Sequence, residues 1–107
     1  MVIILVRKCV RPGREEAFVA DWRAQRPDHP DFLGETLTRI DDLSHLPEPM
    51  RSLPLAAPAG ITYLNVARWR RAESFVEHFR PRTAHNPELE LADELRIVLT
   101  IVEESSS

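Results

Sequence analysis

Two segments near the ends of the chain are apolar at nearly every position, and they restrict its possible folds most strongly. Residues 2–6 (VIILV) and 97–102 (IVLTIV) are rich in β-branched side chains, and both are far shorter than the ~20 residues of a membrane span. A strand that is apolar at consecutive positions has both of its faces buried. At 107 residues the chain has room for one domain. The sequence therefore predicts a single sheet whose terminal strands are covered on both sides.

Helical and extended patterns alternate between these two segments. The clearest helix carries Phe18 and Trp22 on one face, with acidic Glu15 and Glu16 in its first turn. A further short helix is predicted after Asn86, which reads as a cap followed by a first-turn proline. The predicted strands cover residues 2–10, 32–40 (with a possible bulge at Gly34), 61–70 and 97–102, and the predicted helices cover residues 14–25, 72–79 and 87–94.

The main elements follow the order strand, helix, two strands, helix, strand. This is the order of the ferredoxin-like split βαβ fold of the α+β class, an antiparallel sheet with helices on one face. Helices leave the other face open, although the terminal strands are apolar on both. The simplest cover is a second copy, which predicts a homodimer packed sheet to sheet as a dimeric α+β barrel. The domain is expected to span residues 1–104, with a flexible tail at 105–107.

Residues 41–60 interrupt this pattern with four prolines. Long irregular segments are uncommon in small domains and are often functional. The apolar residues within 50–55 favour a lid or a dimer-wrapping arm over disorder.

Composition narrows the classes of partner. The net charge of −3 argues against nucleic acid. RNA-binding modules share the element order, but the third strand here, ITYLNVARW, lacks their Lys/Arg-Gly-aromatic signature. Cys9 is the only cysteine, so a reducing compartment is expected, and with neither a membrane span nor a secretion signal the expected location is the cytoplasm. The four histidines have no metal-ligand spacing, so no metal is predicted.

The third strand carries the most informative polar residue. Side chains alternate along a strand, so Asn65, Ala67 and Trp69 share a face. Ala67 leaves a gap between an amide and an indole, with room for a flat ligand. Buried Asn needs hydrogen-bond partners, so the alternative interpretation is that Asn65 satisfies local backbone and Trp69 is packing.

These features resemble the antibiotic biosynthesis monooxygenase-like family of dimeric α+β barrels. The resemblance covers most of the chain outside residues 41–60. The segments that carry it are VRPGREE at 10–16 with Phe18, the third strand ending in Trp69, Phe75 and His78 in the next helix, and the apolar last strand.

The resemblance implies a cofactor-independent monooxygenase that oxidises a planar phenolic or polyketide-like aromatic to a quinone with O2. In such members the third strand carries Asn and Trp with three residues between them, a spacing that Asn65 and Trp69 match. Asn65 would stabilise the ring oxyanion, and Trp69 would form an apolar wall and contact the peroxide. Haem-degrading members carry an Asn near position 6, where this chain has Val6, which disfavours that branch.

The other candidates surround this pair. His78 could be the base that deprotonates the substrate, because the pKa of histidine lies near 6.5; it could also be a half-buried helix residue. Some members carry a Tyr for proton transfer where this chain has Phe75, and Tyr63 on the Asn65 face could replace it. Arg7 or Lys8, at the end of the first strand, could hold a phenolate oxygen or meet solvent.

Two other classes of function remain open from the sequence. An isomerase or cyclase on the same fold would need a base but no O2. A non-catalytic dimer would bind or sense a small ligand without turning it over.

Overall fold

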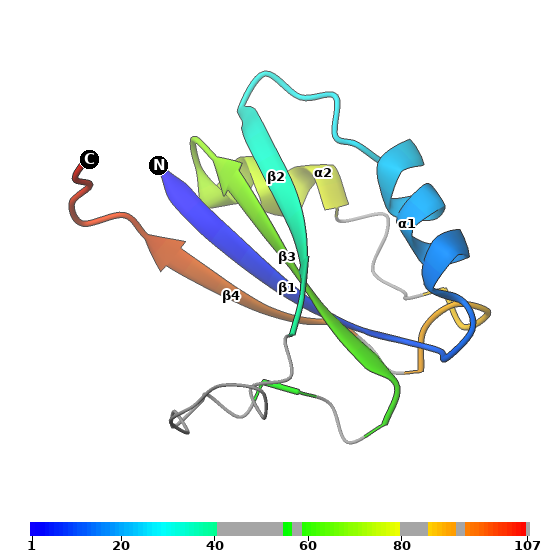
Figure 1. Cartoon of the computed structure of the whole chain (residues 1–107). Helices are drawn as coiled ribbons and strands as arrows, with labels where there is room; N and C mark the ends of the chain where they lie inside the picture. Colours follow the sequence, from blue (N-terminus) through cyan, green and yellow to red (C-terminus); the bar gives the residue numbers. More distant parts are fainter. Residues whose placement is uncertain (41–54, 57–58, 80–85, 92–93, 107) are drawn as a thin grey trace, which may run out of the picture.

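The computed structural model describes residues 1–40, 55–56, 59–79, 86–91 and 94–106. Four strands form one antiparallel sheet in the order β2-β3-β1-β4. The chain therefore has the predicted ferredoxin-like α+β fold (Figure 1). The elements are β1 (Val2–Val10), α1 (Glu15–Ala24), β2 (Phe32–Arg39), β3 (Ile61–Trp69), α2 (Ala72–Phe79) and β4 (Leu95–Thr100).

The two helices pack on the same face of the sheet, at different ends of β3. Phe18 of α1 contacts Tyr63, with ring centroids 5.0 Å apart, whereas Phe75 of α2 contacts Trp69 at 5.9 Å. The core is accordingly divided into two clusters of buried side chains. One contains Val10, Phe18 and Tyr63, and the other contains Ile4, Val6, Ala67, Trp69 and Phe75.

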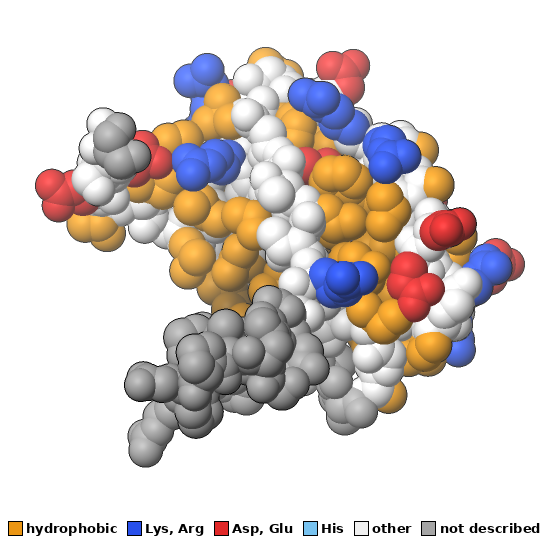
Figure 2. All heavy atoms as spheres, viewed as in Figure 1, with side chains coloured by type: hydrophobic (Ala, Val, Ile, Leu, Met, Phe, Trp, Pro, Cys, Tyr) orange, Lys and Arg blue, Asp and Glu red, His pale blue; other side chains and the backbone are white. Residues whose placement is uncertain are grey.

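The opposite face of the sheet is apolar and open. On β4, Leu95, Ile97 and Leu99 lie beside β1 residues of that face, and their exposed fractions are 55%, 51% and 42%. Figure 2 shows hydrophobic side chains gathered over β1 and β4. Within a single chain β1 is thus covered on one face, whereas every residue of β4 is exposed, including Val98, which pairs with Ile4 on the helix side of the sheet.

The predicted bulge in the second strand is confirmed. The register between β2 and β3 shifts between Phe32 and Gly34. Gly34 has a φ of 137°, a conformation that is accessible mainly to glycine.

The predicted helix at residues 87–94 is wrong over its described part. The chain forms a turn after Asn86 and then an antiparallel bridge between Glu90 and Val10. The backbone N–H of Leu91 donates to the carbonyl of Cys9, and the carbonyl of Leu89 accepts from Arg11. Pairing with the end of β1 therefore takes the backbone groups that a helix would have used.

Most of the proline-rich segment, at residues 41–54 and 57–58, lies outside the described residues, and with it the predicted lid or arm. Within the described part of the chain, neither helix has the length and apolar character of a membrane span.

Candidate functional site

A cavity of about 120 Å³ lies between the sheet and the helices, where the two core clusters leave space on β3. Its floor includes Ala67, which pairs with Ile4 on β1 and with Glu35 on β2. The small Ala67 side chain leaves the gap that the sequence predicts. Its other apolar lining consists of Val6, Phe18, Trp22, Trp69, Phe75 and Phe79, and its polar lining consists of Lys8, Asp21, Gln25, Glu35, Asn65, Asn86, Glu90, Glu94 and Arg96.

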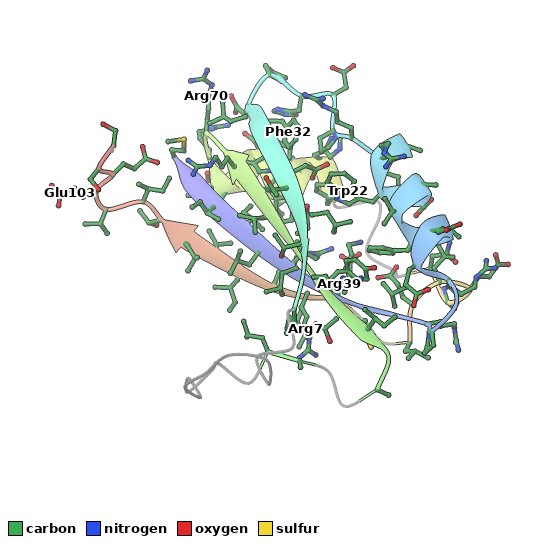
Figure 3. All side chains as sticks on the ribbon, in the orientation of Figure 1. Arg7, Trp22, Phe32, Arg39, Arg70 and Glu103 are labelled. Carbon is green, nitrogen blue, oxygen red and sulfur yellow. The ribbon has the colours of Figure 1, made fainter. Side chains whose placement is uncertain are left out.

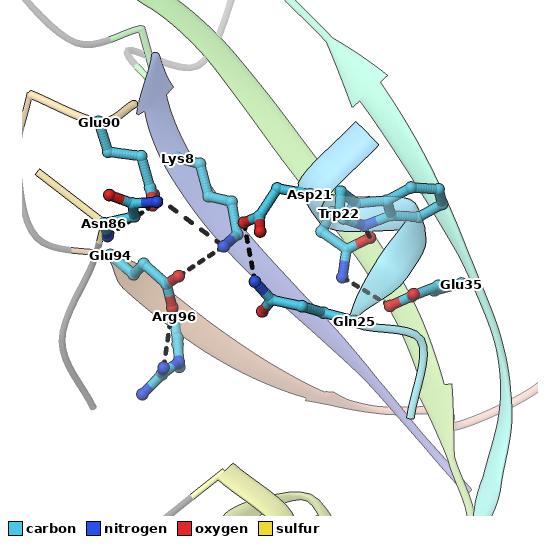
Figure 4. Close-up of polar contacts among 10 residues, drawn as sticks. Lys8, Asp21, Trp22, Gln25, Glu35, Asn86, Glu90, Glu94 and Arg96 are labelled. Atoms are coloured by element: carbon cyan, nitrogen blue, oxygen red, sulfur yellow. Dashed lines mark hydrogen bonds and ion pairs between the residues drawn. The ribbon is translucent and has the colours of Figure 1, made fainter. Parts of the chain in front are cut away.

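Asn65 is 8% exposed and has two side-chain partners from different elements. Trp22 projects from α1 toward β2 and β3 (Figure 3), and its Nε1–H donates to Asn65 Oδ1 at 3.1 Å. Asn65 Nδ2 donates to Glu35 Oε2, also at 3.1 Å (Figure 4). Indole N–H is a donor only, so this contact orients the amide with its nitrogen toward Glu35.

The Glu35 carboxyl has an environment that disfavours its charge. Burial raises the pKa of Glu35 above its ordinary value, and this effect exceeds three opposing ones. The opposing effects are the hydrogen bond from Asn65 and the positive charges of Arg26 and Lys8. A carboxylate with a raised pKa beside a hydrogen-bonded amide is suited to proton transfer.

This raised pKa predicts a pH-dependent change of stability in a Glu35→Gln variant. The folded state binds the Glu35 proton more tightly than the unfolded state does. Glu35 therefore contributes to the free energy of unfolding below its unfolded pKa of about 4.3, and this contribution is lost as the pH rises through the folded pKa. Gln stays neutral at every pH. We therefore expect the variant to melt a few degrees above the wild type at pH 7 and at the same temperature below about pH 4. Thermal unfolding followed by circular dichroism at both pH values measures this; an equal difference at both would contradict it.

Trp69 is fully buried and forms the aromatic centre of the molecule. Five rings surround it, with centroid distances from 5.4 to 6.4 Å. They belong to His29, Phe32, Phe75, His78 and Phe79. Its Nε1 has no hydrogen-bond partner among the described residues. A buried donor of this kind is uncommon, and this one belongs to a residue that lines the cavity.

A charged network lines another side of the cavity. Lys8 Nζ lies 2.5 Å from Glu94 Oε1 and 4.0 Å from Glu90 Oε1. Arg96 Nη2 lies 2.8 Å from Glu94 Oε2 (Figure 4). Glu90 and Glu94 therefore hold the two basic side chains at the edge of the space that Asn65 lines.

The structure brings together three of the six predicted site residues. Asn65, Trp69 and Phe75 line the cavity. His78 contacts the Trp69 ring at 5.9 Å but does not line the cavity. Tyr63 faces the same side as Asn65 but packs on Phe18 in the other core cluster, outside the cavity lining.

Arg7 lies on the opposite face of the sheet from the cavity. It follows Val6 and precedes Lys8, which both line the cavity, and side chains alternate along a strand. Its Nη1 donates to the carbonyl of Leu55 at 3.4 Å. Of the two basic residues at this strand end, Lys8 is the one that reaches the cavity.

The sequence interpretation missed Glu35 and the polar role of Trp22. Glu35 follows the bulge between Phe32 and Gly34. Alternation counted from the start of the strand therefore does not show which face of the sheet its side chain lies on. Trp22 reads as an ordinary apolar helix residue, and only its contact with Asn65 gives its N–H a role. Across the described ranges, no group of three or more His, Cys, Asp and Glu side chains is arranged to hold a metal ion.

Comparison with known proteins supplies one structural relative. A search of protein-family models finds no match, and a search of curated proteins also finds none. Among solved structures, the chain is similar to a mutant of MhuD crystallised with two manganese protoporphyrin IX molecules per active site. The two share 14% sequence identity with a TM-score of 0.60, over the full length of both chains. At this identity, the similarity establishes a common fold.

Proposed function

We propose that this chain is a cofactor-independent monooxygenase of the antibiotic biosynthesis monooxygenase-like family, acting on a planar phenolic or anthrone-like ring. The observation that carries the proposal is that Asn65 and Trp69, two residues with N–H donors, line one cavity between the sheet and the helices. The Asn65 amide and the Trp69 indole line the same cavity, and Trp69 Nε1 has no acceptor among the described residues. A bound substrate, or a peroxide formed on it, would supply that acceptor.

The chemistry needs only the substrate and O2. An anthrone-type ring loses a proton, and its carbanion passes one electron to O2. The resulting ring radical and superoxide combine to form a peroxide on the ring carbon. Loss of water from the peroxide leaves the quinone, so one oxygen atom enters the product and the other leaves in water. An amide donor at the ring oxygen would stabilise the developing enolate. The aromatic lining would exclude bulk water from the reacting carbon.

The cavity is too small to enclose either a porphyrin or a whole fused ring system. A cavity of about 150 Å³ in another protein holds benzene, and the space here is about 120 Å³. One edge of a fused ring system could enter it. The porphyrin of the MhuD structure is larger still, and the lining that its carboxylates would meet is mainly acidic. It contains Asp21, Glu35, Glu90 and Glu94 beside two basic residues, Lys8 and Arg96, that already form ion pairs. The described residues therefore do not fit a porphyrin, and no step is assigned to one.

Anthrone, which has an acidic methylene group and a known quinone product, tests the proposal. We expect the protein to accelerate O2 uptake with formation of anthraquinone in equal amounts. With ¹⁸O2, one labelled atom should enter the quinone. Turnover that continues without O2 would favour the isomerase or cyclase, and binding without turnover would favour the non-catalytic ligand-binding dimer.

We also propose that the open face of the sheet forms a homodimer. Apolar residues of β1, β3 and β4 share this face, including Leu5, Val66 and Ile97 at neighbouring positions. A continuous exposed apolar surface commonly marks an interface.

An Ile97→Glu variant should therefore be a monomer at concentrations where the wild type is a dimer, because the new charge would be buried unpaired between the two sheets. Light scattering coupled to gel filtration measures the masses. Val76→Glu is the matched control, since Val76 is 49% exposed on α2, and it should remain a dimer. A monomeric wild type would remove the proposed interface.

A further inference from the structure

Glu35 lies where a proton acceptor for the bound ring would be needed. It extends from β2 over Ala67, on the face of the sheet that the helices cover. Its Oε2 accepts a hydrogen bond from Asn65 Nδ2 at 3.1 Å. The carboxylate is thus adjacent to the amide that would hold the oxygen of the substrate ring.

The orientation of Asn65 allows its amide nitrogen to donate two hydrogen bonds, one to Glu35 and one to a ligand. The Trp22 N–H occupies Asn65 Oδ1, so Nδ2 is fixed on the side of Glu35. A primary amide nitrogen carries two hydrogens. One is donated to Glu35, which leaves the other to donate to a ligand. A ring oxygen bound there would lie beside the Glu35 carboxylate.

Glu35 also differs from the other cavity carboxylates in its partners. Glu94 forms ion pairs with Lys8 and Arg96, and Glu90 lies 4.0 Å from Lys8. Asp21 accepts from the side-chain amide of Gln25 at 2.7 Å, at the end of α1. The partner of Glu35 is the neutral amide of Asn65. In the described part of the chain Glu35 forms no ion pair, and the charges of Arg26 and Lys8 lower its pKa less than burial raises it. A desolvated carboxylate of this kind is a stronger base than one that is held in an ion pair.

We propose that Glu35 is the base that accepts the proton of the bound ring, while Asn65 binds the oxygen on which the negative charge develops. The proposal rests on the proposed function and names its proton acceptor. The C–H or O–H bond of the ring breaks, its electron pair stays on the substrate, and the proton bonds to a Glu35 oxygen. When the peroxide collapses, its O–O bond and the remaining C–H bond of the ring carbon break, so that a carbonyl forms and hydroxide departs with the second hydrogen. The hydroxide takes up the proton held by Glu35 and leaves as water. This role replaces the one that the sequence leaves open for His78, which lies outside the cavity lining.

Exchange of the anthrone methylene protons in D2O without O2 isolates this step from oxygenation. Proton magnetic resonance measures the exchange rate, and a separate titration measures the dissociation constant of anthrone. We expect the wild type to accelerate the exchange and Glu35→Gln to slow it about 100-fold, the usual contribution of a general base. The dissociation constant should change little, because Gln retains the size and the acceptor oxygen. Glu35→Asp should restore part of the rate.

Asp21→Asn is the matched control, since it removes one negative charge from the lining of the same cavity. Its exchange rate should fall much less than that of Glu35→Gln. Equal losses would overturn the proposal in favour of a general effect of charge. Exchange that persists in Glu35→Gln, or is absent in the wild type, would also overturn it. Oxygen uptake is measured separately. If proton exchange depends on Glu35 but no O2 is consumed, Glu35 is supported as the general base and the proposed oxygenase function is refuted.

Discussion

Replacing Trp69 with Ala should lower the free energy of unfolding by about 3–5 kcal/mol, the usual cost of removing a buried aromatic side chain. Trp69 is fully buried and touches rings from α2, from β2 and from the segment before β2. Its neighbours could not move easily to fill the space left by the indole, because they pack against one another or against the core cluster. These neighbours are Phe32, Phe75, His78 and Phe79. Domains of this size commonly have 5–15 kcal/mol of stability, so the variant should be close to its folding limit. Urea unfolding followed by circular dichroism measures the loss.

Trp22→Ala is the matched control for this prediction, because it removes the same side chain from a half-buried site on α1. Its loss should be clearly smaller than that of Trp69→Ala. Trp69→Phe should lie between the wild type and Trp69→Ala, since it keeps an aromatic ring and removes an N–H that has no partner among the described residues. If Trp22→Ala and Trp69→Ala unfolded at the same urea concentration, Trp69 would not be the packing centre described here.

The arrangement of strands and helices could be predicted because each element has a local pattern of its own. The helix at Glu15–Ala24 has acidic residues at its start and apolar residues one turn apart, and the strands at Val2–Val10 and Leu95–Thr100 contain several β-branched residues. The segment after Asn86 has an equally good local helix pattern, yet it pairs with Val10 and Cys9. Those partners are at least 80 residues away in the sequence, so a local pattern could not reveal them.

The candidate site could be predicted along one strand but not across strands. Alternation on β3 places Asn65 and Trp69 on one face, and both line the cavity. Glu35 reaches the same cavity because β2 pairs with β3 and is shifted by the bulge after Phe32. The helix position of His78 made it a candidate base, but its ring lies beside Trp69 and His29. Whether Glu35 and His78 reach the cavity depends on contacts between different elements. The residue pattern within a single strand or helix gives no information about such contacts.

Asn65→Ala should reduce the rate of anthrone oxidation about 10²–10³-fold, the usual effect of removing one oxyanion donor. The loss should appear in kcat more than in KM, because the ring oxygen gains its negative charge only as the proton leaves. The same substitution leaves the Trp22 N–H and the Glu35 carboxylate without their partner, which should cost about 1–3 kcal/mol of stability. Steady-state O2 uptake, measured well below the melting temperature of the variant, separates the two effects.

Trp22→Phe tests whether the Asn65 amide acts in catalysis or only forms structural hydrogen bonds. It keeps Asn65 but removes the N–H that orients it, so the amide is free to turn away from the ring oxygen. We expect a loss of about tenfold in kcat, because a misplaced donor retains part of its effect. Asn65 would be a structural residue if Asn65→Ala kept the wild-type kcat. In that case its two hydrogen bonds would serve only to fasten α1 and β2 to β3, and the oxygenase assignment would lose its oxyanion donor.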